Sequence, residues 1–524
     1  TYFVLALNED GTITVVDPLF GFGGTKLLEM VFLKGPGDDW VVSSDSALLF
    51  VSMPEIGEVA VVETASWKVI ANIPVGVGAR RLALQADGRY LWVAVDRGAT
   101  PGVAAIDTAK LQRAAFIPTV GGVQDLALSS DDATLYVAHR EAGKVSVIDV
   151  RSTQKIREVT VGRRPISLDY SKLAAAAFVA CEDGTIAVVD AESPTPVAVM
   201  TAEPGLAQIR FAPNGRLAFV ANPATDHVHI VDAATRRLIQ TADVEDQPDQ
   251  ISFSAELAYV RHRGADTVLM IPLSEVGKPG GTIPVIDFPG GQFPPGDMAR
   301  PTPAAGIVSA PGEAAVLVAN PSDQMIYFYK EGMAAPMGSF KNYSRQPRAV
   351  LALDRSLGPV GPGRYETTIT LGKPGRRDLA LLVNSPRLTH CFPFEVLENP
   401  ARPQKGAALS VEARVDTRRP MVGREMALRF QLTDTATRTP ATGLTDVYIT
   451  TFLSPGMLRR RTLAVETSPG LYQIPFTPPE VGAYFAFVEV LSKGLRVEQS
   501  PPLVLEALES QTDPEASGEK VEGR

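Results

Sequence analysis

The sequence predicts an all-β protein, and three observations support this. One alternating run recurs every 41 to 46 residues, and its copies end at Asp17, Glu63, Asp107, Asp149, Asp190 and Asp232. Each copy contains short apolar runs of period two separated by polar turns, which is typical of strands. Beyond residue 345, segments 349–396 and 461–507 parallel each other. We therefore predict a seven- or eight-bladed β-propeller followed by two β-sandwich units of the immunoglobulin-like kind.

Each repeat is divided into four strands. In the copy around residue 140, the first strand is the run in QDLALSSDD (124–132), and LYVAH (135–139) is the second. VSVID (145–149) is the third and QKIREVTVG (154–162) the fourth. Aspartates that end the third strands are predicted to cap the turns that follow, because Asp favours turns.

The number of blades depends on how the two ends of the propeller region, 1–345, are treated. Segments 246–292 and 314–332 are divergent copies, and residues 4–18 supply a second and a third strand without a clear first strand. Eight blades result if the ends form separate blades, and seven if they share one blade as a closing seam. We favour eight because both ends carry their own second and third strands.

The pattern changes after the propeller region. We predict one sandwich unit at 346–399, to which strands from residue 326 onward can belong, and a C-terminal unit at 400–509. The tail, 510–524, has no apolar periodicity and is predicted to be disordered.

The stretches YVAHREAGKVSVID (136–149) and FVANPATDHVHIVD (219–232) resemble the YVTN family of β-propeller repeats. The span 1–345 is similar to the eight-bladed propeller of the haem-containing cytochrome nitrite reductases, and the last unit is similar to immunoglobulin-like modules appended to bacterial exported and respiratory proteins. The resemblance implies a multihaem cytochrome or respiratory complex as a partner. It implies no particular chemistry, because propellers host many unrelated activities.

Composition and motifs narrow the function. The net charge is -9 and no basic block of five or more residues occurs, so a nucleic-acid partner is not expected. No apolar run of 18 residues occurs, so no membrane span is expected. The first residue is Thr1, which suggests a processed form, and we expect a periplasmic or extracellular location. The sequence lacks G-x-S-x-G, Walker, H-E-x-x-H, EF-hand and C-x-x-C-H motifs, which favours a protein that is not an enzyme.

Equivalent positions of the blades form rings in a propeller. The residue after each second strand places His139, Cys181 and His262 on one rim. Imidazole and thiolate bind transition metals, so His139 and His262 are candidate ligands of a haem or a metal. The alternative is that these side chains only cap turns.

The starts of the first strands give a second ring near the channel mouth. Its polar members are candidate binding residues for a polar ligand or a partner loop, and the alternative is that their opposite charges neutralise each other. This ring contains Asp39, Arg81, Asp125, Pro165, Gln208, Gln250 and Ala305.

A copper site is a further candidate. His390 and Cys391 lie in LTHCFPF, and the internal duplication places Met333 and Met337 in the same sandwich, which gives a set of soft ligands. Neighbouring strand residues point to opposite faces, however, so packing in a core is the alternative.

The pair His227 and His229 shares one face of a strand, as metal sites in sheets do. No third ligand is evident in the sequence, which favours a surface pair without a metal.

We therefore predict a non-catalytic binding or scaffold protein outside the cytoplasm, whose propeller and immunoglobulin-like units dock protein partners without a cofactor. The alternative is a redox protein that binds haem or copper at the propeller rim or in the first sandwich unit.

Overall fold

The computed structural model describes most of the chain, in two compact units, Thr1–Thr370 and Leu371–Arg524. None of the described residues forms a helix that is long and apolar enough to cross a membrane. The described residues are 2–18, 27–98, 100–278, 282–296, 302–311, 314–331, 333, 335–361, 363–367, 375–384, 387–397, 408–453, 457–495, 497 and 500–509.

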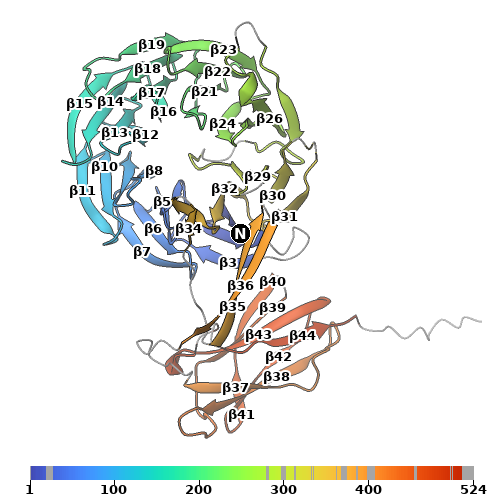
Figure 1. Ribbon diagram of the computed structural model, residues 1–524. Helices are drawn as coiled ribbons and strands as arrows, with labels where there is room; N and C mark the ends of the chain where they lie inside the picture. The colour runs from blue at the N-terminus through green and yellow to red at the C-terminus, as the bar shows by residue number, and fades with distance from the viewer. Residues whose placement is uncertain are drawn as a thin grey trace, which may run out of the picture. The chain divides into compact units, whose positions relative to one another are not determined.

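Within these residues, the first unit contains eight four-stranded antiparallel sheets, which lie in a ring (Figure 1). We number them 1 to 8 in chain order. Sheet 1 consists of β3 (Leu27–Phe32), β2 (Thr12–Val16), β1 (Tyr2–Asn8) and β32 (Pro347–Asp354). Sheet 2 consists of β4 (Trp40–Val42), β5 (Leu48–Met53), β6 (Glu58–Glu63) and β7 (Lys68–Pro74).

Sheets 3 to 5 repeat this order. Sheet 3 consists of β8 (Ala79–Leu84), β9 (Tyr90–Val95), β10 (Gly102–Asp107) and β11 (Gln112–Pro118). Sheet 4 consists of β12 (Val123–Leu128), β13 (Thr134–His139), β14 (Lys144–Asp149) and β15 (Gln154–Thr160). Sheet 5 consists of β16 (Pro165–Ser171), β17 (Ala176–Cys181), β18 (Thr185–Val189) and β19 (Ala198–Thr201).

Sheets 6 to 8 complete the ring. Sheet 6 consists of β20 (Ile209–Phe211), β21 (Leu217–Asn222), β22 (His227–Asp232) and β23 (Arg237–Asp243). Sheet 7 consists of β24 (Pro248–Phe253), β25 (Leu257–His262), β26 (Thr267–Pro272) and β27 (Ile286–Pro289), with the short 3₁₀ turn η2 (Leu273–Glu275) before β27. Sheet 8 consists of β28 (Ile307–Ser309), β29 (Ala315–Asn320), β30 (Met325–Lys330) and β31 (Gly338–Lys341).

A hydrophobic cluster fills each gap between successive sheets. For example, Trp92 and Val103 of sheet 3 pack against Leu126 and Val137 of sheet 4. Equivalent clusters follow between all other neighbours, including sheet 8 and sheet 1. The inner strands are buried on both faces because each sheet packs against two others, and the ring closes on itself. This architecture supports the predicted β-propeller fold.

The ring is closed by a strand that lies far from the N-terminus in sequence. β32 pairs antiparallel with β1, with Val4 opposite Ala352 and Leu5 opposite Leu351. The predicted boundary at residue 345 therefore differs from the structure, which places 347–354 in sheet 1. The reason is that β1 would otherwise present an unpaired edge. This strand also supplies the first strand that the N-terminal repeat lacks.

Aspartates cap the turns that follow the third strands, as the sequence predicted. The carboxylate of Asp107 accepts hydrogen bonds from the backbone of Ala109 and Lys110 at 3.1 and 2.9 Å. Asp149, Asp190 and Asp232 accept equivalent bonds from backbone N–H groups two or three positions later in the chain. These aspartates have a structural role.

The second unit ends in a two-sheet sandwich. One sheet consists of β37 (Leu409–Arg414), β38 (Met426–Asp434), β42 (Leu471–Phe476) and β41 (Val465–Ser468). The other consists of β40 (Met457–Leu463), β39 (Val447–Leu453), β43 (Gly482–Val490) and β44 (Leu503–Ala507), with the 3₁₀ turn η3 (Leu491–Lys493) after β43. Alternate residues of both sheets, such as Phe430 and Val488, share one core.

No second sandwich forms among the described residues of 346–399. Beyond β32, this segment contains two hairpins, β33 (Gly358–Gly361) with β34 (Arg364–Glu366) and β35 (Gly375–Asn384) with β36 (Arg387–Val396). β30 and β31, which the duplication assigned to a sandwich, belong to sheet 8. A hairpin and a sandwich edge have the same alternating pattern, so the sequence did not separate them. The predicted disordered tail, 510–524, lies outside the described residues.

Candidate functional site

The predicted channel-mouth residues lie on the first strands of their sheets or beside them, and Figure 1 shows these strands facing the centre of the ring. The Asp39 carboxylate accepts a hydrogen bond from the Leu82 backbone at 2.9 Å. Asp125 accepts one from the Leu168 backbone at 3.1 Å. Each bond joins one sheet to the next, so these side chains tie the inner wall of the ring together.

The glutamines of the predicted ring act in the same way. Gln208 accepts a hydrogen bond from the Ile251 backbone at 2.7 Å, and Gln250 accepts one from Gly306 at 2.7 Å. The Gln250 amide also donates to the Thr302 and Ala304 carbonyls. The structure thus brings the predicted residues into one ring, but these bonds use much of their hydrogen-bonding capacity.

Arg81 neutralises two of the carboxylates. Its Nη1 lies 3.2 Å from Asp39 and its Nε 2.9 Å from Asp125. Burial raises the pKa of Asp39, although Arg81 opposes the shift. Burial alone would lower the pKa of Arg81, but the carboxylates of Asp39, Asp125 and Asp169 raise it instead. The opposite charges of Arg81, Asp39 and Asp125 therefore neutralise each other, which was the alternative to a ligand-binding role for this ring.

A cavity of about 290 Å³ lies next to this network. Residues of sheets 3 to 7 and of the segments around residues 295 and 302 line it. Its charged lining residues are Arg80, Asp125, Arg210, Asp249, Arg261 and Arg263. Four arginines face two aspartates, so cationic groups predominate in a chain whose net charge is -9.

Arg261 is the most distinctive residue of this cavity. It is 5% exposed, and its Nε and Nη2 bind the two oxygens of Asp249 at 2.9 and 2.5 Å. The remaining nitrogen, Nη1, is buried and has no hydrogen-bond partner among the described residues. An unsatisfied buried donor costs about 1–3 kcal/mol, so an acceptor from a ligand would be favourable here.

The sequence holds a signal for Arg261 that the repeat pattern alone did not single out. The residue before the rim position is Ala in most repeats, as in Ala138, Ala180, Ala221 and Ala319, whereas sheet 7 has Arg261. Arg210 and Arg80 carry no comparable signal, because they lie on first strands whose sequences vary.

Arg210 extends the cationic wall. Its Nη1 donates to the Ser167 hydroxyl at 3.1 Å and to the Ile209 carbonyl at 2.7 Å. Burial and the neighbouring Arg81 lower its pKa, although Asp125 and Asp169 oppose this.

The predicted rim ligands do not fit a haem. His139 and His262 are both fully buried. The Nε2 atom of His139 hydrogen-bonds the Ser146 hydroxyl at 2.8 Å, and His262 Nδ1 donates to the Thr267 carbonyl at 3.1 Å. Both bonds stay within one sheet, and a fully buried imidazole offers no open face to a tetrapyrrole. The prediction placed these residues on one rim of the propeller, and the structure buries both side chains at the ends of the second strands.

Burial shifts the pKa values of the rim residues toward their uncharged forms. Burial lowers the pKa of His139 to about 4 and also lowers the pKa of His262. It raises the pKa of the Cys181 thiol to about 12. At neutral pH the two imidazoles are uncharged and the cysteine is a thiol, which is a poor metal ligand.

The predicted copper ligands lie in different units. Met333 and Met337 lie between β30 and β31 of the first unit and are exposed. His390 and Cys391 are exposed neighbours on β36 of the second unit. His390 contacts Phe392, with ring centroids 4.4 Å apart. The internal duplication predicted that the two methionines lie in the same sandwich as His390 and Cys391, and the structure does not place them there.

An aromatic surface that the sequence analysis did not identify lies on the sandwich. Phe452 stacks on Phe485 and Phe487, with ring centroids 5.5 and 5.9 Å apart, on the face opposite the core. Val504, opposite Phe485 on the next strand, is 42% exposed. Aromatic residues are enriched at protein interfaces.

No protein-family model matches the chain, and no curated protein matches it significantly. Among solved structures, it is similar to the dihydro-heme d1 dehydrogenase NirN in complex with DHE, with a TM-score of 0.51 and 13% identity over 67% of this chain and 74% of that one. The first unit is a β-propeller.

Two further matches among solved structures have lower scores. Hydrazine synthase of Kuenenia stuttgartiensis matches with a TM-score of 0.45 and 17% identity over 56% of this chain and 96% of that one. The Cps50 (Swd1) β-propeller domain of Myceliophteria thermophila matches with a TM-score of 0.38 and 13% identity, over 50% of this chain and 86% of that one. At these identities the likeness concerns the fold alone.

Proposed function

We propose that the chain is a non-catalytic binding or scaffold protein outside the cytoplasm that docks protein partners, and that the propeller cavity receives an acidic segment of a partner. Each of the eight sheets is one blade of the YVTN type in this proposal, and the C-terminal sandwich is an immunoglobulin-like module. A multihaem cytochrome or another subunit of a respiratory complex remains the predicted partner, and the location remains a prediction.

The observation that carries the proposal is the unpartnered Nη1 of Arg261 in a cavity lined by four arginines. Asp249 already neutralises this guanidinium and fixes its plane, so Nη1 is an oriented donor. A carboxylate oxygen of an acidic side chain is the acceptor that such a donor binds best.

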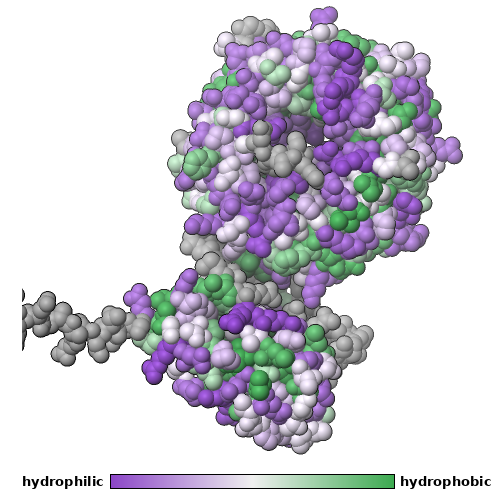
Figure 2. Space-filling view, turned by 180° about the vertical axis from the view of Figure 1, so that it is seen from behind, coloured by the Kyte–Doolittle hydropathy of each residue, from purple (hydrophilic) through white to green (hydrophobic). Residues whose placement is uncertain are grey.

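The size of the cavity favours a short segment. Ligand pockets for drug-sized molecules measure about 300–1,000 Å³. A cavity of about 290 Å³ lies at the lower limit and suits a few side chains of a partner loop. The propeller face that Figure 2 shows is mostly hydrophilic, which suits a docking surface with a polar rim.

The aromatic surface of the sandwich supports a second docking contact. Phe452, Phe485 and Phe487 present stacked rings on the outer sheet face. Two docking surfaces on one chain are what a scaffold needs in order to raise the effective concentration of its partners.

The test is a quantitative comparison of proteins that co-purify with the tagged chain from its native source. Arg263→Glu places a negative charge at the cavity, and Arg237→Glu makes the same change on the exposed start of β23, outside the cavity lining. We expect at least one partner to be retained by the wild type and Arg237→Glu and lost from Arg263→Glu. Identical partner sets for all three proteins would refute the proposed role of the cavity.

A further inference from the structure

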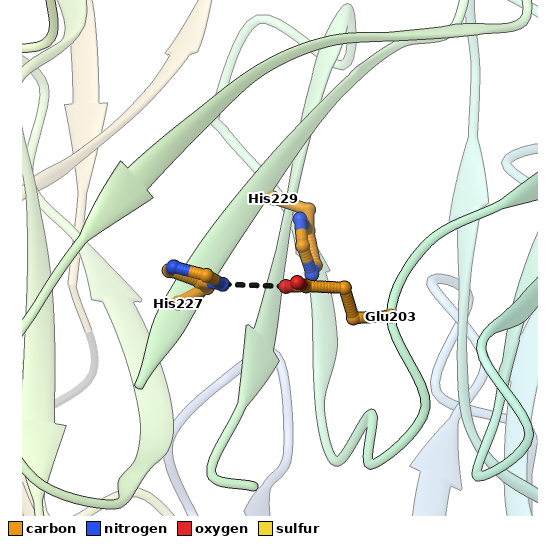
Figure 3. Close-up of side chains that lie close together, drawn as sticks. All are labelled: Glu203, His227 and His229. Carbon is orange, nitrogen blue, oxygen red and sulfur yellow. Dashed lines mark hydrogen bonds and ion pairs between the residues drawn. The ribbon is translucent and has the colours of Figure 1, made fainter. Parts of the chain in front are cut away.

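A cluster of three potential metal ligands lies between sheets 5 and 6, separate from the residues that line the cavity. His227 and His229 are alternate residues of β22, and Glu203 follows β19 of the preceding sheet. One ligand atom from each residue lies within 4.8 Å of the other two (Figure 3). We propose that Glu203, His227 and His229 bind one divalent transition metal ion of the zinc class.

His229 provides the strongest observation. Its side chain is 3% exposed, so it does not belong to a surface pair as the sequence suggested. Its Nδ1 lies 3.0 Å from the Thr241 hydroxyl, and its Nε2 is buried without a hydrogen-bond partner among the described residues. Figure 3 shows one ring nitrogen of His229 directed at the Glu203 carboxylate. With the Nδ1 proton donated to Thr241, Nε2 carries a lone pair aimed into the cluster.

The buried Nε2 atom of His229 is suited to ligation. Leaving a buried polar atom without a partner is unfavourable. A bound ion would therefore satisfy an atom that the folded chain leaves unsatisfied.

His227 is held from its far side. Its Nε2 lies 3.1 Å from Asp243, and its Nδ1 lies 2.6 Å from Glu203. Histidines that bind metals usually donate their other ring N–H to a carboxylate, which fixes the tautomer. Asp243 fits this role and turns the Nδ1 of His227 toward the cluster.

Glu203 supplies the third ligand and can adjust. Its side chain is 52% exposed, and its carboxylate lies 2.6 Å from Nδ1 of His227. Zinc binds imidazole nitrogen and carboxylate oxygen at about 2.0–2.2 Å, so the contact between His227 and Glu203 must open when the ion enters. Rotation of an exposed glutamate allows this without moving either strand.

The ligand set defines the class of ion. Two imidazoles and one carboxylate suit zinc and its neighbours in the first transition series, whereas magnesium and calcium prefer oxygen ligands. The fourth position of a tetrahedral ion would be open to water or to an external group.

The experiment is titration of the metal-free full-length chain with Zn²⁺, followed by calorimetry and by the shift in thermal unfolding. We expect one equivalent to bind and to raise the midpoint of unfolding. Glu203→Gln and His229→Gln should each weaken binding by about tenfold or more, and Asp243→Asn by about tenfold. Because Glu203 is exposed, its variant keeps the fold even if His229→Gln does not.

His390→Gln is the matched control, because this exposed histidine lies in the second unit. It should leave Zn²⁺ affinity unchanged. Absence of a site that saturates at one equivalent, an unchanged affinity in Glu203→Gln, or a loss of binding in His390→Gln would each overturn the proposal. The result does not depend on the channel cavity, so it leaves the proposed function untouched.

Discussion

The guanidinium of Arg261 occupies space that any side chain at position 306 would need. A Cβ atom built on Gly306 would lie 2.2 Å from Nη1 of Arg261 and 3.2 Å from Oε1 of Gln250. Arg261 cannot simply turn away, because Asp249 binds its other two nitrogens. The absence of a side chain at Gly306 therefore makes room for the one arginine at this repeat position.

Gly306→Ala should consequently disturb the cavity. We expect the added methyl group to displace Nη1, to lower stability by about 1–3 kcal/mol and to weaken partner binding. Chemical denaturation measures the first effect, and retention of the partner on the immobilised chain measures the second. Gly121→Ala, at a glycine without a positive φ and with no atom within 4 Å of an added Cβ, controls for the loss of a glycine alone. Equal partner retention by the wild type and Gly306→Ala would show that Arg261 does not contribute to docking.

The closing strand gives a second prediction. A chain that ends at residue 361 keeps β32. One that ends at residue 345 leaves one edge of β1 unpaired and removes Ala349, Val350 and Leu353 from two core clusters. We expect the longer chain to unfold cooperatively as a monomer and the shorter one to aggregate or to unfold at much lower denaturant concentration. Circular dichroism with size-exclusion chromatography decides this, and equal midpoints would contradict the role assigned to β32.

The buried His139 predicts a dependence of stability on pH. Its pKa is about 4 in the folded chain against the ordinary value of 6.5 for an exposed histidine, so between these values the unfolded chain binds more protons. The neutral imidazole therefore makes its full contribution to the free energy of unfolding above pH 6.5. This contribution is lost as the pH falls toward 4, and the total loss is about 3 kcal/mol.

His139→Gln should therefore lose less stability than the wild type over this range, as urea denaturation at several pH values would show. His390→Gln, which changes an exposed residue, should behave like the wild type. The assignment fails if the three proteins have parallel pH profiles.

The two cysteines should differ sharply in reactivity. Cys181 is fully buried with a pKa of about 12, whereas Cys391 is an exposed free thiol. Because the thiolate is the reactive form, we expect one thiol of the native chain to react quickly with an aromatic disulfide reagent. Cys391→Ser should remove the fast phase, and unfolding should expose the second thiol. Fast reaction of the Cys391→Ser protein would mean that the Cys181 environment opens readily.

The features that could be predicted from the sequence are those that a local side-chain pattern specifies. The runs that end at Asp107 and Asp149 repeat because each sheet needs the same alternation to pack against two neighbours, so the all-β fold and the propeller were predictable. The sandwich core around Phe430 and Val488 was predictable for the same reason. The assignment of 346–399 to its own sandwich was not supported, because an alternating pattern identifies a strand but not its partner.

The candidate sites show the same limit. The ring of Asp39, Arg81 and Asp125 was expected from repeat geometry and does assemble, although its members bind one another. Glu203 could not be assigned to His227 and His229, because it follows the last strand of the preceding sheet and no sequence signal links the three residues.

The sequence by itself determined that this chain forms short alternating strands in repeated units, because side-chain periodicity is a local property written in consecutive residues. Only the tertiary structure decided that β32 closes the ring on β1, that His139 and His262 are buried, and that Glu203 lies near His229. These are contacts between residues far apart in sequence, and they are fixed by the packing of whole sheets around a closed ring.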